Sequence, residues 1–280
     1  MLNDLKTAGI ADPAAMLSVF EALALAAGAE IMDVRGKGVT AETKADASPV
    51  TEADRRAEAV ILKGLAQSFP HIPVIAEEEV SAGRVPAIGD GPFILVDPLD
   101  GTKEFVGGKT DFTVNIALVA GGVPLVGVVY APARGRMWTG RPGHAETATV
   151  EGGKAGARHA ISGASCPDRV RMVASKSHRT PETDAFIARH GDCETVSVGS
   201  SLKFCLLADG SADIYPRFGR TMEWDTAAGD AVLRAAGGTV LRADGAPLAY
   251  GKRNQADDSD FANPHFIAAS AQARDRLTLP

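Results

Sequence analysis

The chain has 280 residues, 45% of them hydrophobic and 23% charged, which is enough to bury a sizeable core in one large domain or two ordinary ones. Its formal net charge of -6 argues against a face for nucleic acid or anionic membrane as the main activity, so an anionic substrate would need local positive charge. Three cysteines without metal-type spacing indicate buried thiols in a reducing compartment, and no signal-peptide pattern opens the chain, so we expect a cytoplasmic protein.

Two helices are predicted near the start of the chain. Asp12-Pro13 is a favourable N-cap and first-turn pair, and the rich apolar run over residues 14–34 predicts the first helix. The most apolar part of this run, residues 22–32, is too short for a membrane span. A polar loop is expected over residues 36–48.

Thr51 is the expected N-cap of the second helix, with Asp54 in the place of the capping-box glutamate, and Pro70 is expected to end that helix. A short strand over residues 72–75 and a loop over residues 81–92 should follow. The later pattern predicts a central strand from residue 93, a β-hairpin over residues 112–130 around a Gly-Gly turn, and another strand over residues 136–139.

Residues 141–168 are rich in Gly and Ala, and we expect a domain boundary there, with a metal-binding domain over 1–150 and a substrate-binding domain over 151–280. The first domain has α+β character. After the boundary, strands and helices alternate, which is typical of an α/β layer with helices on its faces. The expected strands are 170–175, 194–198, 212–215 and 238–242, and the expected helices are 181–190, 201–208 and 224–236.

The run Phe-Ile-Leu-Val-Asp-Pro-Leu-Asp-Gly-Thr, residues 93–102, organises the rest of the chain. It starts as an apolar strand, is expected to break at Pro98, and sets Asp97 and Asp100 on either side of the break. Two convergent carboxylates can hold a hard divalent cation, usually magnesium. The backbone N–H groups of Gly101-Thr102 would make an anion site beside it. Alone, however, Asp-Pro and Asp-Gly pairs are common turn formers.

Acidic residues recur at the ends of other predicted elements. Asp54 stands near a helix start, Glu77-Glu78 after a strand, and Asp225 at the opening of a helix. Each could simply complement a helix dipole or lie in a solvated loop. As a set they indicate convergence, because ligands of α/β proteins usually bind at the carboxyl edge of the sheet.

The string Asp-Pro-Leu-Asp-Gly-Thr resembles the metal-binding signature of the inositol monophosphatase superfamily. With the Lys-Glu-Phe that follows it, the string is similar to the branch of CysQ-type 3'(2'),5'-bisphosphate nucleotidases. Residues 224–229, Trp-Asp-Thr-Ala-Ala-Gly, are similar to the family's C-terminal signature. The resemblance implies a layered α-β-α-β-α sandwich, and two or three Mg²⁺ ions in each site.

The resemblance also implies roles for individual residues. The implied metal ligands are Glu77, Asp97, the carbonyl of Leu99, Asp100 and Asp225. The implied catalytic residues are Asp54, Thr102 and Glu77. A divalent ion lowers the pKa of water, and Asp54, through Thr102, would orient that water and take its proton.

The second half of the chain is expected to choose the substrate. The implied substrate contacts are Gly101, Thr102, Ser175, His178, Ser200, Lys203, Arg217 and Asp225. Alone, Ser200 could be only an N-cap, His178 a surface residue and Lys203 a solvated cation. Together, Lys203, Arg217 and His178 suit a substrate with two phosphates better than a neutral polyol with one.

We therefore expect a Mg²⁺-dependent hydrolase that removes the 3'-phosphate of 3'-phosphoadenosine 5'-phosphate, serves sulfur assimilation and is inhibited by lithium. An inositol monophosphatase or fructose-1,6-bisphosphatase is the near alternative. A non-catalytic phosphate-binding regulatory protein is the alternative from another class, and the carboxylate set argues against it, because buried unpaired carboxylates are costly without a metal. A homodimer and a peripheral position at the inner face of the cell membrane stay open, and no nucleic acid is expected as partner.

Overall fold

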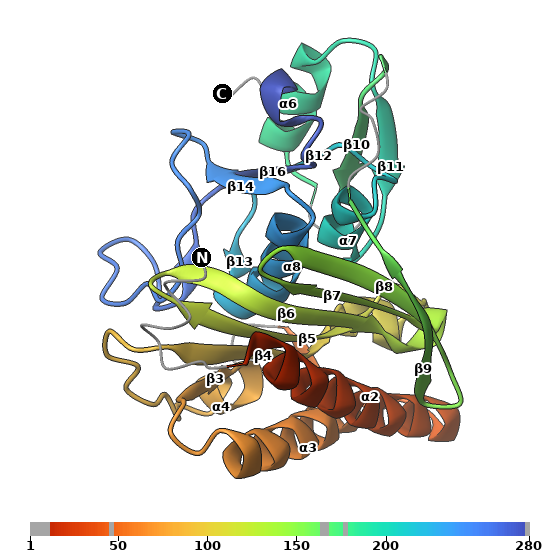
Figure 1. Ribbon diagram of the computed structural model, residues 1–280, viewed down its shortest axis with the longest axis vertical. Coiled ribbons are helices and arrows are strands. Elements are labelled where there is room, and N and C mark those ends of the chain that lie inside the picture. The colour runs from red at the N-terminus through yellow and green to blue at the C-terminus, as the bar shows by residue number, and fades with distance from the viewer. Residues whose placement is uncertain (1–11, 45–47, 163–167, 176–178, 278–280) are drawn as a thin grey trace.

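Helices and sheets alternate in five layers in the computed structural model of the protein, which describes residues 12–44, 48–162, 168–175 and 179–277 (Figure 1). The layers are α2 and α3, a seven-stranded sheet, α7 and α8, a five-stranded sheet, and α6. The helices are α2 (Pro13–Lys37), α3 (Glu52–Ser68), α6 (Pro181–Arg189), α7 (Leu202–Ala208) and α8 (Glu223–Ala235). The expected α-β-α-β-α sandwich is confirmed.

Both N-terminal helices begin where their caps predict. The side chain of Asp12 accepts from two backbone N–H groups of α2, and Thr51 and Asp54 form both halves of a capping box on α3. By length and composition α2 could cross a membrane, a property that buried core helices share. Here its side chains Phe20 and Ile31 are fully buried, within the core that α2 forms with α3 and the first sheet.

The first sheet has the strand order β3-β4-β5-β6-β7-β8-β9, with β3 parallel to β4 and the other pairs antiparallel. Its strands are β3 (Val74–Ala76), β4 (Phe93–Asp100), β5 (Thr113–Ala120), β6 (Val123–Ala131), β7 (Arg136–Arg141), β8 (His144–Glu151) and β9 (Lys154–Ala160). The predicted hairpin is β5 and β6. The stretch 141–168, where a domain boundary is expected, contains the hairpin of β8 and β9. The first sheet therefore extends to Ala160, and a division into two domains stays a proposal.

The second sheet has the order β11-β10-β12-β16-β14, in which β10 runs parallel to β11 and β12, and β16 runs antiparallel to β12 and β14. Its strands are β10 (Arg171–Ala174), β11 (Glu194–Ser197), β12 (Ile214–Arg217), β14 (Thr239–Arg242) and β16 (Phe266–Ala269). All but β16 match predicted strands. Cys205 is buried and Cys193 half-buried, and both are free, whereas Cys166 lies outside the described residues.

Short elements complete the fold and surround the carboxylates. They are β1 (Ala41–Thr43), β2 (Pro49–Thr51), α4 (Glu77–Ser81), α5 (Thr102–Val106), η1 (Pro132–Arg134), β13 (Thr221–Met222), β15 (Ala262–Asn263) and η2 (Arg274–Arg276). β1 pairs with β2, so the stretch expected to be a loop over residues 36–48 contains a strand. The Glu run after β3 forms the helix α4 instead of a solvated loop, with Glu77 as its first residue.

Alternate residues of the central strand pack into different layers. Ile94 and Val96 of β4 belong to the core under α2 and α3, whereas Phe93 and Leu95 belong to the core shared with α7, α8 and the second sheet. Side chains of a strand point to opposite faces in turn, and both faces are covered here. This explains why the sequence reads as one continuous apolar run.

Two glycines let α8 lie close to the first sheet. Gly127 of β6 pairs directly with Gly140 of β7. A Cβ atom on Gly127 would stand 2.7 Å from the Ala228 carbonyl oxygen, and one on Gly140 would stand 2.6 Å from the Val232 Cα atom. Since the close atoms belong to the α8 backbone, the whole helix would have to move, and it carries Asp225 in its first turn.

We expect Gly127→Ala to lower the free energy of unfolding by about 1–3 kcal/mol, the usual cost of overpacking. Urea denaturation of the metal-free protein measures the loss. Gly36→Ala is the matched control, because no atom lies within 4 Å of a Cβ there and alanine favours the helix. An unchanged midpoint for Gly127→Ala would show that the close approach of α8 is dispensable.

Candidate active site

A β-bulge brings the two aspartates of the central strand to one face. Asp97 pairs with Asn115 and Asp100 with Thr113, so a step of three residues along β4 matches a step of two along β5. Without the extra residue, side chains three apart would point to opposite faces. Pro98, which has no N–H to give the ladder, lies in this bulge, and β4 continues to Asp100 where the sequence predicted a break. The bulge thus lets the carboxylates of Asp97 and Asp100 converge on one face of the sheet.

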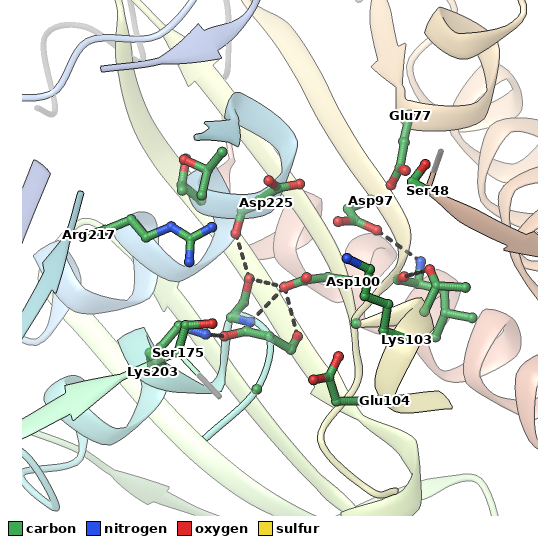
Figure 2. A pocket seen from close by; sticks show the side chains of 18 of the residues that line it. Ser48, Glu77, Asp97, Asp100, Lys103, Glu104, Ser175, Lys203, Arg217 and Asp225 are labelled. Atoms are coloured by element: carbon green, nitrogen blue, oxygen red, sulfur yellow. Dashed lines mark hydrogen bonds between the residues drawn. The ribbon is translucent and has the colours of Figure 1, made fainter. Parts of the chain in front are cut away.

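One cavity of about 240 Å³ opens at this edge, between the two sheets. Figure 2 shows Glu77, Asp97 and Asp225 around it, with Arg217 and Lys203 approaching from the side opposite Glu77. The predicted site residues that line it are Glu77, Asp97, Leu99, Asp100, Gly101, Thr102, Ser175, Ser200, Lys203, Arg217 and Asp225. Asp54 lies behind Thr102, and His178 lies outside the described residues.

The carboxylates of the cavity disfavour one another's charge. Burial, reinforced by Glu77, Asp100 and Asp225, raises the pKa of Asp97 well above its usual range. Burial raises the pKa of Asp225 to about 8, with Asp100 and Glu77 adding to the shift. Burial also raises the pKa of Glu77 to about 7, although Lys44 opposes the shift. Positive charge beside these carboxylates would therefore stabilise their ionised forms.

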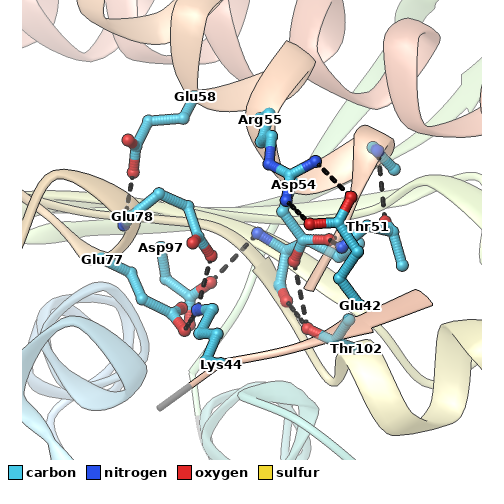
Figure 3. Close-up of polar contacts among 12 residues, drawn as sticks. Glu42, Lys44, Thr51, Asp54, Arg55, Glu58, Glu77, Glu78, Asp97 and Thr102 are labelled. Atoms are coloured by element: carbon cyan, nitrogen blue, oxygen red, sulfur yellow. Dashed lines mark hydrogen bonds and ion pairs between the residues drawn. The ribbon is translucent and has the colours of Figure 1, made fainter. Parts of the chain in front are cut away.

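Lys44 supplies part of that charge, and the sequence analysis did not single it out. Its ammonium lies 2.7 Å from Glu77 Oε1 and 2.6 Å from Glu78 Oε1, and its side chain is 9% exposed (Figure 3). Burial by itself would lower the pKa of Lys44, but these two carboxylates together outweigh it and raise the pKa. A lysine in a polar stretch after β1 carries no local sign of this contact, because Glu77 is 33 residues away.

The implied metal ligands are of the chemical type that binds a hard divalent cation. They are carboxylates and one backbone carbonyl, the oxygen ligands that Mg²⁺ prefers. Among the residues that the structure describes, however, no three His, Cys, Asp or Glu side chains stand close enough together to hold one ion. The candidate ligands line one cavity but do not surround a common point, and Lys44 donates to Glu77.

Asp54 and Thr102 are joined behind the carboxylates. Thr51 donates to Asp54 Oδ2 from its N–H at 2.7 Å and from its hydroxyl at 2.6 Å. Thr102 Oγ1 lies 3.1 Å from Asp54 Oδ1 and 3.1 Å from the carbonyl oxygen of Leu99. Burial raises the pKa of Asp54, in spite of these hydrogen bonds, and so makes it a stronger base than an exposed aspartate. The capping box of α3 thus aims one carboxylate oxygen at Thr102 (Figure 3).

The predicted cations are buried in the cavity wall instead of solvated. Lys203 donates to the carbonyl of Ser200 and stands over the Tyr215 ring at 5.3 Å. Arg217 donates to the carbonyls of Gly219 and Arg220 at 3.1 and 2.9 Å. The hydrogen bonds of both side chains go to neutral backbone carbonyls, and Asp100 and Asp225 are among the acidic groups that act on the charge of Lys203. A charged donor that is not tied to one carboxylate can bind a second anionic group of a substrate.

Several residues of the cavity were not predicted as site residues. Those with polar side chains are Ser48, Lys103, Glu104, Ser201, Tyr215, Arg220, Thr221 and Thr226. Ser201 and Arg220 stand beside or near predicted residues, so proximity in the sequence could have suggested them. The alternative role for Ser200 is wrong, because the N-cap of α7 is Ser201, whose side chain makes no capping bond.

Comparisons with known proteins agree with this geometry. The profile of the inositol monophosphatase family matches residues 12–275. A 3'(2'),5'-bisphosphate nucleotidase CysQ of Escherichia coli O157:H7 is 44% identical over 246 residues, which cover 87% of this chain and 95% of the relative. The nucleotidase CysQ of Buchnera aphidicola is 38% identical over 257 residues, covering 91% and 94%.

Solved structures give the same picture. The crystal structure of CysQ from Bacteroides thetaiotaomicron, a bacterial member of the inositol monophosphatase family, superposes with a TM-score of 0.73 at 37% identity, covering 91% of this chain and 97% of that one. An inositol monophosphatase from Anabaena superposes with a TM-score of 0.69 at 24% identity, covering 94% and 93%, and that likeness shows the fold alone.

Proposed function

The chain belongs to the inositol monophosphatase family, and from that premise we propose that it is a Mg²⁺-dependent phosphatase that converts 3'-phosphoadenosine 5'-phosphate to AMP and phosphate. One observation carries the proposal: the implied carboxylate ligands line the same cavity as two buried cations, Lys203 and Arg217. The relatives of the chain named 3'(2'),5'-bisphosphate nucleotidase CysQ support it. The same proposal includes two or three ions per site, a homodimer, a cytoplasmic location and the roles of single residues.

The chain's own groups account for positioning and proton transfer. When bound, a divalent cation supplies neutralisation of phosphate charge and a more acidic water molecule. Glu77, Asp97, Asp100, Asp225 and the carbonyl of Leu99 would hold it. While Thr102 donates its hydrogen to Asp54, its oxygen can accept from the attacking water. The proton of that water passes through Thr102 to Asp54.

The opposite wall selects the substrate. With the 3'-phosphate at the carboxylates, the 5'-phosphate needs cations of its own, and Lys203 and Arg217 stand across the same cavity. A charge-assisted hydrogen bond to phosphate contributes roughly 1.5–3 kcal/mol. Inositol 1-phosphate has no second phosphate to use these groups, which favours the nucleotide bisphosphate.

A substrate panel tests the function. Phosphate release from 3'-phosphoadenosine 5'-phosphate, inositol 1-phosphate and fructose 1,6-bisphosphate is measured with Mg²⁺ and with excess chelator. We expect the nucleotide to be hydrolysed fastest and only with Mg²⁺. Lithium should inhibit this hydrolysis, and sodium should not. No release from any substrate would overturn the phosphatase proposal, and a preference for inositol 1-phosphate would overturn the nucleotidase assignment.

Replacing Lys203 or Arg217 by Met is expected to lower kcat/KM for the bisphosphate about ten- to a hundredfold, since each 1.4 kcal/mol is about tenfold. Hydrolysis of inositol 1-phosphate should change much less. Burial lowers the pKa of Lys203 to about 8, so its charge is present below that pH and is lost above it. The preference for the bisphosphate should therefore fall as pH rises through about 8 in the parent but not in Lys203→Met.

Lys63→Met is the control for this comparison, because Lys63 is exposed on α3. Equal losses on both substrates would mean that Lys203 and Arg217 act structurally or at the shared carboxylates, and that the nucleotide preference comes from other groups.

A further inference from the structure

The turn that joins β11 to α7 follows a strand of the second sheet and contacts Asp100, a carboxylate of the first sheet. Three of its donors converge on a single oxygen, Asp100 Oδ2: the Ser200 hydroxyl at 2.7 Å, the Ser201 N–H at 2.6 Å and the Ser201 hydroxyl at 2.8 Å. A carboxylate oxygen that faces several donors is fixed in orientation, and the other oxygen, Oδ1, is left for a cation.

The same turn reaches the other aspartate of the site. Ser201 Oγ lies 2.6 Å from the backbone carbonyl of Asp225, and its residue is 2% exposed. A hydroxyl has one hydrogen, so it donates to Asp100 or to Asp225 at one time. Asn115 donates its side-chain N–H to Ser201 Oγ at 3.0 Å. Ser201 therefore joins the bulge of β4 to the first turn of α8.

The turn is itself held in place at several points. Ser200 has φ of +56°, a left-handed conformation that costs free energy for a residue with a side chain. Asp111 accepts from the Gly199 N–H at 3.2 Å and pairs with Arg134, while Lys203 donates to the Ser200 carbonyl. Thr113 Oγ1 lies 2.6 Å from Ser200 Oγ. These contacts over-determine a strained turn, as is common where strain serves a site.

We propose that Ser200 and Ser201 are positioning residues that orient Asp100 and Asp225 for the cation, a role that rests on the proposed function of those aspartates. This differs from the substrate contact that the sequence suggested for Ser200. The hydroxyls act on the carboxylate instead of on the substrate. Groups that orient metal ligands typically contribute about 10- to 100-fold in metal affinity.

Titration calorimetry of the substrate-free protein with Mg²⁺ tests the proposal. Ser201→Ala is expected to weaken Mg²⁺ binding about 10- to 100-fold, and Ser201→Thr, which keeps the hydroxyl, should recover most of it. Ser270→Ala is the matched control, because Ser270 is also buried but its hydroxyl accepts from the Ala273 N–H, outside the cavity. In kinetics, Ser201→Ala should raise the Mg²⁺ concentration for half-maximal activity, with little effect at saturating Mg²⁺.

Ser200→Gly separates positioning from a structural role. Glycine relieves the left-handed strain and removes the hydroxyl, so the metal-free protein should be at least as stable while its Mg²⁺ affinity falls. If Mg²⁺ affinity is unchanged in both serine variants but falls in Asp100→Asn, the positioning role is overturned and the proposed site stands. If Asp100→Asn also leaves Mg²⁺ binding unchanged, the proposed cation site fails with it.

Discussion

Asp97→Asn is expected to reduce phosphate release from 3'-phosphoadenosine 5'-phosphate by about a thousandfold or more at a fixed Mg²⁺ concentration. Charge stabilisation by a metal is worth several kcal/mol, and each 1.36 kcal/mol is about tenfold in rate. Asp97 is buried at the centre of the carboxylates, where Glu77, Asp100 and Asp225 all act on it. An amide in its place keeps the shape of the side chain but removes one full negative charge from the proposed cation site.

The same change should not destabilise the metal-free protein. Since neighbouring carboxylates disfavour the charge of Asp97, a neutral amide relieves repulsion in a buried place. We expect the urea midpoint of Asp97→Asn to equal or exceed that of the parent without metal, and Asp225→Asn to behave alike. Glu21→Gln is the control for activity, because Glu21 pairs with Arg158 on β9 and does not line the cavity. Full activity of either aspartate variant would remove these residues from the cation site.

The second large effect is expected at Asp54, the proposed proton acceptor. Asp54→Asn should lower kcat by about 10²- to 10⁴-fold, the usual contribution of a positioned base. Mg²⁺ affinity should change little, because Asp54 lies behind Thr102 and does not line the cavity. The asparagine oxygen can still accept from Thr51, so the cap of α3 and the stability of the protein should be nearly kept.

A double-mutant cycle with Thr102 tests whether the two residues act as one unit. Thr102→Val should cost about as much as Asp54→Asn, and the double variant little more than either. Thr102→Ser should retain activity because it keeps the hydroxyl. Glu52→Gln, an exposed change in the same turn of α3 as Asp54, should have no effect. Additive losses in the double variant would mean that Asp54 and Thr102 act independently, which contradicts the proton relay.

The sequence by itself determined two helix starts, one hairpin and the family signature. Asp12-Pro13 and the pair Thr51 and Asp54 start their helices, and the hairpin over residues 112–130 turns at its glycines, because caps and turns are made by residues close in sequence. The Asp-Pro-Leu-Asp-Gly-Thr string likewise predicted the family and, with it, the layered fold, since the whole signature lies within one strand end and turn.

The tertiary structure alone decided how these pieces meet. The bulge that sets Asp97 and Asp100 on one face requires β5 as partner, and β8 and β9 gain their pairing only from each other and β7. Lys44 finds Glu77 across 33 residues, and Ser201 finds Asp100 across 101. Such contacts depend on the packing of two sheets around α8. A single sequence shows only residue types and their spacing. The orientation of a buried carboxylate is set by groups that the fold brings from far along the chain.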